Sequence, residues 1–196
     1  YGEPTPFSVR QQLYFEFLPS ENGIVASGIW RLRITPRRIR NGLIHLWLPS
    51  GNLIMNQTRF LNPEETTTLT VPSTNPFSIS VGAYDSSLNT FAAFSGRGYT
   101  NGSNFIKPDL CAPGVNIMSC APGGGYTVNS GTSMAVAFVS GCCARLMEWG
   151  IKKGNDPYLY GEKVKAFLIR GCKTLPAYNI YPNPSLGHGI LCLRDS

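Results

Sequence analysis

The chain has 196 residues, of which 42% are hydrophobic and 14% are charged. This balance is typical of a packed globular protein and excludes an intrinsically disordered one. The net charge of +6 is concentrated between residues 31 and 40, where five arginines lie. Binding to nucleic acid would need interleaved aromatic residues or a docking motif, and only Trp30 is close. We therefore expect a solvated strand face there and no nucleic-acid partner.

The chain contains no run of about 18 apolar residues, so we expect no membrane span. It begins at Tyr1 without a signal-peptide pattern, and we expect it to be a piece of a longer protein. Six cysteines occur without a Cys-x-x-Cys pair or a nearby histidine, so a zinc signature is absent. Their small or apolar neighbours predict reduced core residues and favour a reducing or anaerobic setting.

Residues 1–62 alternate apolar and polar side chains in short runs. The pattern predicts strands at 13–17, 30–34 and 43–48, with turn residues between them. Several short strands of this kind favour a jelly-roll-like sandwich, incomplete here because three or four strands rarely close such a unit. His45 lies inside the third strand, and we interpret it as a packed or surface residue without a catalytic role.

From residue 63 onward, strands are followed by helices. Residues 77–83 predict a short buried strand, and residues 133–149 predict a long apolar helix buried on most sides. Gly150 and Gly154 are signals for the end of that helix. A second amphipathic helix is predicted at 163–170. This order of elements fits an α/β layer with a mostly parallel sheet.

The most informative stretch is Asn-Ser-Gly-Thr-Ser-Met-Ala at residues 129–135. Gly131 lets another backbone approach closely, and we expect Thr132 to cap the helix. Ser133 then falls in the first helical turn, where unpaired N–H groups and the helix dipole favour negative charge. Its hydroxyl can attack a carbonyl, and its own N–H can donate to the resulting oxyanion. An isolated Gly-Thr-Ser triplet would be explained by an ordinary capped helix. The neighbouring motifs therefore decide whether Ser133 is interpreted as a nucleophile.

Four segments, in chain order, resemble the subtilisin-like serine proteases. They are Val-Gly-Ala at 81–83 with Phe94 and Ser95, Lys-Pro-Asp and Ala-Pro-Gly within 107–117, the nucleophile motif at 131–135, and Gly-His-Gly-Ile-Leu at 187–191. The resemblance covers about residues 66–193. Each motif alone is short, but their order and spacing together are specific to this family.

The resemblance implies an α/β fold in which residues 63–196 are the C-terminal half of a parallel-sheet catalytic domain. Residues 1–62 would be part of an all-β jelly-roll-like insertion, similar to that of the Csp group of bacterial spore-germination subtilases. Members of this group act on, or regulate, the activation of a cortex-degrading hydrolase zymogen. The implied reaction is hydrolysis of a protein or peptide substrate through an acyl-enzyme on Ser133, supported by Gly131 and Thr132.

In this family the triad runs Asp, His, Ser along the chain, and the partners of Ser133 are not found. The polar residues that could be considered lack the flanking sequence of the family's catalytic positions: His45, His188, Asp85, Asp109, Asn52 and Asn56. We therefore expect the missing N-terminal half of the same polypeptide to supply the aspartate, the histidine and the oxyanion asparagine. The chain alone is predicted to be inactive.

Two other functions stay open. Ala137 and Phe138 stand where the family has proline and histidine, which leaves room for a catalytically inactive subtilase that binds or regulates a partner. A β-rich module that binds an anionic polymer through its arginines is the third interpretation. We expect no cofactor, and the sequence leaves a structural calcium ion open. A bacterial, spore-associated or extracytoplasmic location follows from the resemblance.

Overall fold

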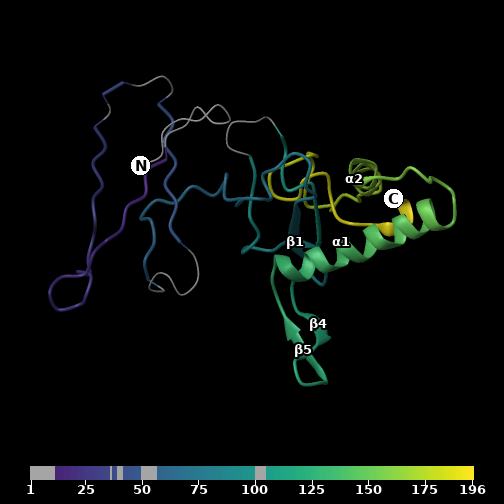
Figure 1. Cartoon of the computed structure of the whole chain (residues 1–196), viewed down its shortest axis with the longest axis horizontal. Helices are drawn as coiled ribbons and strands as arrows, with labels where there is room; N and C mark the ends of the chain where they lie inside the picture. Colours follow the sequence, from purple (N-terminus) through teal and green to yellow (C-terminus); the bar gives the residue numbers. More distant parts are fainter. Residues whose placement is uncertain (1–11, 36, 39–41, 50–56, 100–104) are drawn as a thin grey trace. The chain divides into compact units, whose positions relative to one another are not determined.

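Figure 1 shows the computed structural model of the chain, which describes residues 12–35, 37–38, 42–49, 57–99 and 105–196. The chain divides into two compact units, Tyr1–Met55 and Asn56–Ser196. The division lies a few residues before the predicted boundary after residue 62.

The first unit contains no strand among its described residues, so the predicted strands at 13–17, 30–34 and 43–48 are not formed. Local contacts are present instead: the rings of Phe17 and Trp30 lie 4.8 Å apart, and the Trp30 indole N–H donates to the Ala26 carbonyl. Alternating apolar residues form a sheet only when neighbouring strands and a second layer cover them. The apolar side chains of the three predicted strands are not buried here, so the pattern lacks that cover.

The second unit contains a three-stranded sheet and a separate hairpin. Strand β1 (Val81–Asp85) pairs in parallel with β3 (Leu110–Pro113) and in antiparallel with β2 (Thr90–Phe91). The hairpin joins β4 (Ile117–Cys120) to β5 (Tyr126–Asn129) and extends from the start of α1 (Figure 1). The sequence predicted the mixed α/β content and a mostly parallel sheet, but it did not predict the strand at Leu110–Pro113 that forms the parallel pair.

Helix α1 (Thr132–Met147) contacts β1 and β3 and continues as one π-helical segment, η2 (Glu148–Lys152). Helix α2 (Gly161–Arg170) buries Val164 and Leu168, which confirms the predicted second helix. A short 3₁₀ segment, η3 (Leu193–Asp195), lies near the end of the chain.

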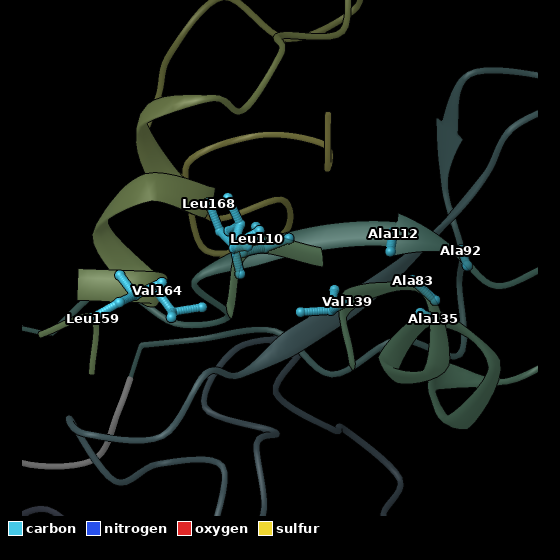
Figure 2. Close-up of a cluster of buried hydrophobic side chains, with 10 residues drawn as sticks. Ala83, Ala92, Leu110, Ala112, Ala135, Val139, Leu159, Val164 and Leu168 are labelled. Carbon is cyan, nitrogen blue, oxygen red and sulfur yellow. The ribbon is translucent and has the colours of Figure 1, made fainter. Parts of the chain in front are cut away.

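The core lies where the two helices meet one face of the sheet (Figure 2). Four alanines lie at this junction, and their small side chains let α1 approach the strands closely: Ala83, Ala92, Ala112 and Ala135. Larger aliphatic side chains such as Leu110, Val164 and Leu168 fill the space near α2. On the other face Tyr84 and Cys111 pack against Leu175 and Leu186. The alternation of Leu110, Cys111 and Ala112 between the two faces is the period of a strand.

Strand β1 begins at Val81, later than the predicted start at residue 77. Successive turns occupy the preceding segment, with Asn75 N donating to Pro72 O and Ser78 N donating to Asn75 O. The Asn75 side chain also accepts a hydrogen bond from Phe77 N. These bonds satisfy the backbone locally and delay the strand.

The burial of α1 differs from the prediction. Only Ala135, Val139 and Leu146 are buried, while Val136 and Phe138 keep 45% and 43% of their surface exposed. The sheet and α2 cover a single face of the helix, so the other face is left open among the described residues of the second unit. Within the described residues, the segment Thr132–Lys152 is also the one helix long and apolar enough to cross a membrane, by length and composition alone. The absence of a membrane span stays a prediction.

Gly150 does not end α1, contrary to the prediction, because it lies inside η2. A Cβ at Gly150 would lie 2.8 Å from Leu159 Cδ2, so this glycine is a packing position. Gly154, with a φ of 77°, follows the π-helical segment in the left-handed conformation that ends helices.

Candidate active site

Ser133 is the second residue of α1, and its side chain is exposed. Both observations fit the predicted nucleophile, because the hydroxyl is reachable and lies in the first helical turn. The hydroxyl has no hydrogen-bond partner among the described residues, so the chain's described part brings no general base to it. The catalytic role of Ser133 stays a prediction.

Thr132 does not cap the helix, contrary to the prediction. The N-cap is Gly131, and Thr132 is already the first helical residue. No side chain accepts a hydrogen bond from the cap, and no acidic residue lies in the first turn. The N–H groups there are thus left without a side-chain acceptor, which is the condition an oxyanion site requires.

Gly131 fits its predicted supporting position for a stereochemical reason. Its φ of 158° and ψ of 162° are rarely adopted by residues with a Cβ. The chain thus enters α1 from the hairpin through a nearly extended residue whose positive φ favours glycine.

Two hydrogen bonds hold this loop to the turn that follows β3. Gly131 N donates to Gly114 O at 2.8 Å, and Asn116 N donates to the Ser130 hydroxyl at 2.8 Å. Gly114 N in turn donates to Tyr84 O at the end of β1. The nucleophile loop is therefore fixed at the carboxyl ends of the parallel strands, where α/β proteins place their sites.

The contact at Gly114 is close enough to exclude any side chain. A Cβ on this residue would lie 2.6 Å from Ala83 Cβ and 2.9 Å from Gly131 O. The Ala-Pro-Gly motif therefore serves to let the sheet, the turn and the nucleophile loop meet at one point. The sequence alone showed the motif but did not show the close packing that requires a glycine at its third position.

The described residues weighed as partners of Ser133 lie in other environments. Asp85 accepts backbone hydrogen bonds from Ser87 and Leu88 and so caps its own turn. His188 N donates to Asp109 O, and burial lowers the pKa of the His188 imidazole. His45 belongs to the first unit, where its Nε2 is shielded from solvent and has no hydrogen-bond partner among the described residues. Asn52 and Asn56 lie outside the described residues.

Asp109 belongs to a buried ion cluster that the sequence did not reveal. Its carboxylate pairs with Lys107 at 2.7 Å and with Lys165 of α2 at 2.8 Å, and it accepts a hydrogen bond from Ser80 N. The Lys107 side chain is 1% exposed. Burial is the main cause that lowers the pKa of Lys107, and the Asp109 carboxylate opposes this shift. The cluster is structural, since it joins α2, the start of β3 and the segment before β1.

The cysteines are free thiols, as predicted, but not all of them are core residues. Cys111 is buried and Cys120 is exposed on the hairpin, while the others are half-buried. No group of three or more metal-ligating side chains occurs in the part of the chain that the structure describes.

The model of the subtilase family matches residues 45–189. This chain belongs to the subtilase family. The match includes the loop before α1, the sheet and both α-helices.

The chain is similar to three known proteases. The structure of the Clostridium perfringens CspB protease is similar at a TM-score of 0.67 and 51% identity, over 69% of this chain and 29% of that one. Subtilisin E of Bacillus subtilis is 42% identical over 82 residues, which are 42% of this chain and 19% of subtilisin E. The maturation protease PagA is similar at a TM-score of 0.55 and 30% identity, over 67% of this chain and 45% of that one. The CspB similarity supports a Csp-type subtilase, and this chain spans less than a third of CspB or of subtilisin E.

Proposed function

We propose that this chain is the nucleophile-bearing part of a serine endopeptidase, with Ser133 as the residue that is acylated by the peptide substrate. The observation that carries the proposal is the exposed Ser133 at the second position of α1, behind a glycine cap that leaves the first-turn N–H groups without a side-chain acceptor. In the reaction the Ser133 oxygen attacks the peptide carbonyl, and the Ser133 N–H donates to the oxyanion. Water then hydrolyses the acyl-enzyme.

The general base, its orienting aspartate and the second oxyanion donor would come from the N-terminal half of the same polypeptide. The open face of α1, with Val136 and Phe138 exposed, is where that half would pack. Loss of the base lowers kcat by about 10⁶, so the 196-residue chain alone is expected to be inactive. We therefore expect peptide-bond hydrolysis only when both halves of the catalytic domain are present.

Labelling with a fluorophosphonate tests this proposal. The full-length polypeptide should be labelled stoichiometrically, the variant Ser133→Ala should not be labelled, and the 196-residue chain alone should not react. Ser140→Ala is the matched control, because Ser140 is exposed on the same helix and is expected to leave labelling unchanged. Labelling of the isolated chain at Ser133 would show that the general base lies within these 196 residues. It would contradict the proposal that the N-terminal half of the polypeptide supplies the base.

A catalytically inactive subtilase that binds or regulates a partner is the second candidate. The replacement of the family's proline and histidine by Ala137 and Phe138 favours it, because Phe138 presents an apolar side chain at 43% exposure beside the first helical turn. Absence of labelling in a folded full-length polypeptide would support this function. Retention of the Ser133 hydroxyl favours the peptidase.

The remaining proposals rest on the similarity to the Csp-type protease. The first unit would be part of a jelly-roll-like insertion whose strands form only with partner strands outside the described residues. The partner is a protein or peptide substrate, and no cofactor is proposed. A bacterial, spore-associated or extracytoplasmic location is consistent with free thiols kept in a reducing or anaerobic setting.

A further inference from the structure

The charge of the chain is divided unevenly along the sequence. Of the 17 basic residues, six lie between Glu21 and Glu64, and all six are arginines. No aspartate or glutamate lies in that interval, so the remaining basic residues balance the 11 acidic ones. The net charge of +6 therefore resides in this one stretch, and peptide hydrolysis at Ser133 uses none of it.

Four of these arginines lie near one another in the sequence of the first unit and are described by the structure: Arg31, Arg33, Arg37 and Arg38. We propose that this arginine set binds an acidic segment of the protein substrate, distinct from the peptide bond that Ser133 attacks. The inference rests on the proposed peptidase function, because that function makes a protein chain the partner that the enzyme meets.

The arginine set carries charge that the first unit does not compensate. All four side chains are exposed, and their guanidinium groups make no ion pair or hydrogen bond with any described residue. Glu16 and Glu21, the acids in the described part of this unit, do not pair with them. A free guanidinium group can bind a carboxylate through two parallel N–H···O bonds, which a lysine cannot do.

The second unit shows the opposite arrangement. Within residues 57–99 and 105–196, seven basic side chains pair with acids of the same unit, among them Arg97 with Glu65 and Lys163 with Asp156. The chain thus supplies acids where its cations are used for its own structure. The lack of acids around the arginine set points instead to a partner that supplies them.

Nucleic acid is the other common polyanion, but the surroundings of the arginine set do not suit it. Single strands bind on a series of aromatic side chains that stack with successive bases. Trp30 is the aromatic residue next to the arginine set. Its ring centroid lies 4.8 Å from that of Phe17, and its indole N–H donates to the Ala26 carbonyl. Carboxylates need no stacking partner, so an acidic protein segment fits better.

Such binding has a definite kinetic consequence. Contacts outside the reacting bond are equally strong in the ground state and the transition state, so they lower KM and leave kcat unchanged. Salt screens exposed charges, with a Debye length of about 8 Å at physiological ionic strength. The contribution of the arginine set to KM should therefore disappear at high salt.

Binding of labelled poly-L-glutamate to the full-length polypeptide tests the site directly. Fluorescence anisotropy is measured in the Ser133→Ala variant, so that binding does not depend on hydrolysis. Adding Arg31→Gln and Arg33→Gln should raise the Kd about tenfold, about threefold for each lost ion pair. About 0.5 M sodium chloride should abolish binding.

The matched control removes the same charge from the second unit. Lys152 and Lys153 are exposed and make no ion pair with a described residue. Lys152→Gln with Lys153→Gln should therefore bind poly-L-glutamate like the protein with both lysines.

Hydrolysis measures the kinetic consequence in the full-length polypeptide with Ser133 intact. A peptide substrate extended by a run of glutamates should have a lower KM than the same peptide extended by glutamines. Arg31→Gln with Arg33→Gln should remove this difference, with kcat and the rate of fluorophosphonate labelling unchanged.

Failure of this inference is distinguishable from failure of the peptidase function. Absence of fluorophosphonate labelling contradicts the peptidase, whereas the anisotropy measurement does not involve Ser133. Equal Kd values with and without the two arginines would overturn the inference. Tighter binding of oligothymidylate than of poly-L-glutamate of equal charge would also overturn it and would assign the arginine set to nucleic acid. This last comparison uses the unsubstituted arginines and decides even if a variant fails to fold.

Discussion

A hydroxyl at the start of a helix is an efficient nucleophile only if the backbone around it holds the oxygen in place. In this chain two hydrogen bonds from the turn after β3 fix the loop that precedes Ser133. One of them is accepted by the Ser130 hydroxyl, so it depends on a side chain. It can be removed by a single substitution that leaves Ser133 and its N–H unchanged.

We expect Ser130→Ala to slow acylation of Ser133 by about fivefold in the full-length polypeptide, because the lost hydrogen bond contributes on the order of 1 kcal/mol. The rate of fluorophosphonate labelling measures the effect, and kcat should fall with KM unchanged. Ser130→Thr keeps the acceptor and should restore the rate. Ser119→Ala, which removes an exposed hydroxyl from β4, should have no effect. Equal labelling rates for Ser130→Ala and the unsubstituted protein would show that the loop needs no such bond.

Among the elements, α2 is held to the sheet by charge as well as by Val164 and Leu168. Lys165 donates to Ser78 O and pairs with Asp109, and Lys107 binds both of the same groups. One buried carboxylate thus compensates two ammonium groups. Removal of one partner from a buried pair costs more than the pair contributes, because a charge is left without compensation.

Asp109→Asn should therefore lower the free energy of unfolding by about 3–5 kcal/mol. Urea unfolding of the chain measures this loss. Lys165→Met should cost less, because the Lys107–Asp109 pair survives. Asp195→Asn should change little, since the Asp195 side chain is 41% exposed. An Asp109→Asn variant as stable as the unsubstituted chain would mean that the cluster does not hold α2.

The sequence predicted the elements whose signals are local. The amphipathic period placed α2 almost at its observed bounds, and the nucleophile motif placed Ser133 in the first turn of α1. Elements that need distant partners were not predicted correctly: the apolar runs of the first unit form no strand in its described part. The Ser130–Asn116 bond and the Lys165–Asp109 pair join residues far apart in the chain, and no sequence pattern marked them.

At the scale of the whole molecule, buried acids determine how stability depends on pH. Among the residues that the structure describes, five groups have a raised pKa, with burial as the largest cause in each: Tyr84, Cys111, Cys142, Cys143 and Cys172. The folded chain keeps protons that the unfolded chain releases above about pH 8.5. Because the native state then binds more protons than the unfolded state, stability falls as pH rises. The lowered pKa of Lys107 acts in the opposite direction, but it is a single group.

We therefore expect stability to change little between about pH 7.5 and 8.5, above the titration of His188, and to decrease steadily toward pH 11, as the thiols of the unfolded chain ionise. Thermal unfolding midpoints, measured from pH 7 to 11 with a reductant present, report the decrease. Cys172→Ala should flatten the slope because it removes a thiol whose pKa is raised to about 12, while Cys120→Ser should reproduce the slope of the unsubstituted chain. A midpoint that rises between pH 8.5 and 10 would mean that Lys107 outweighs the five acids.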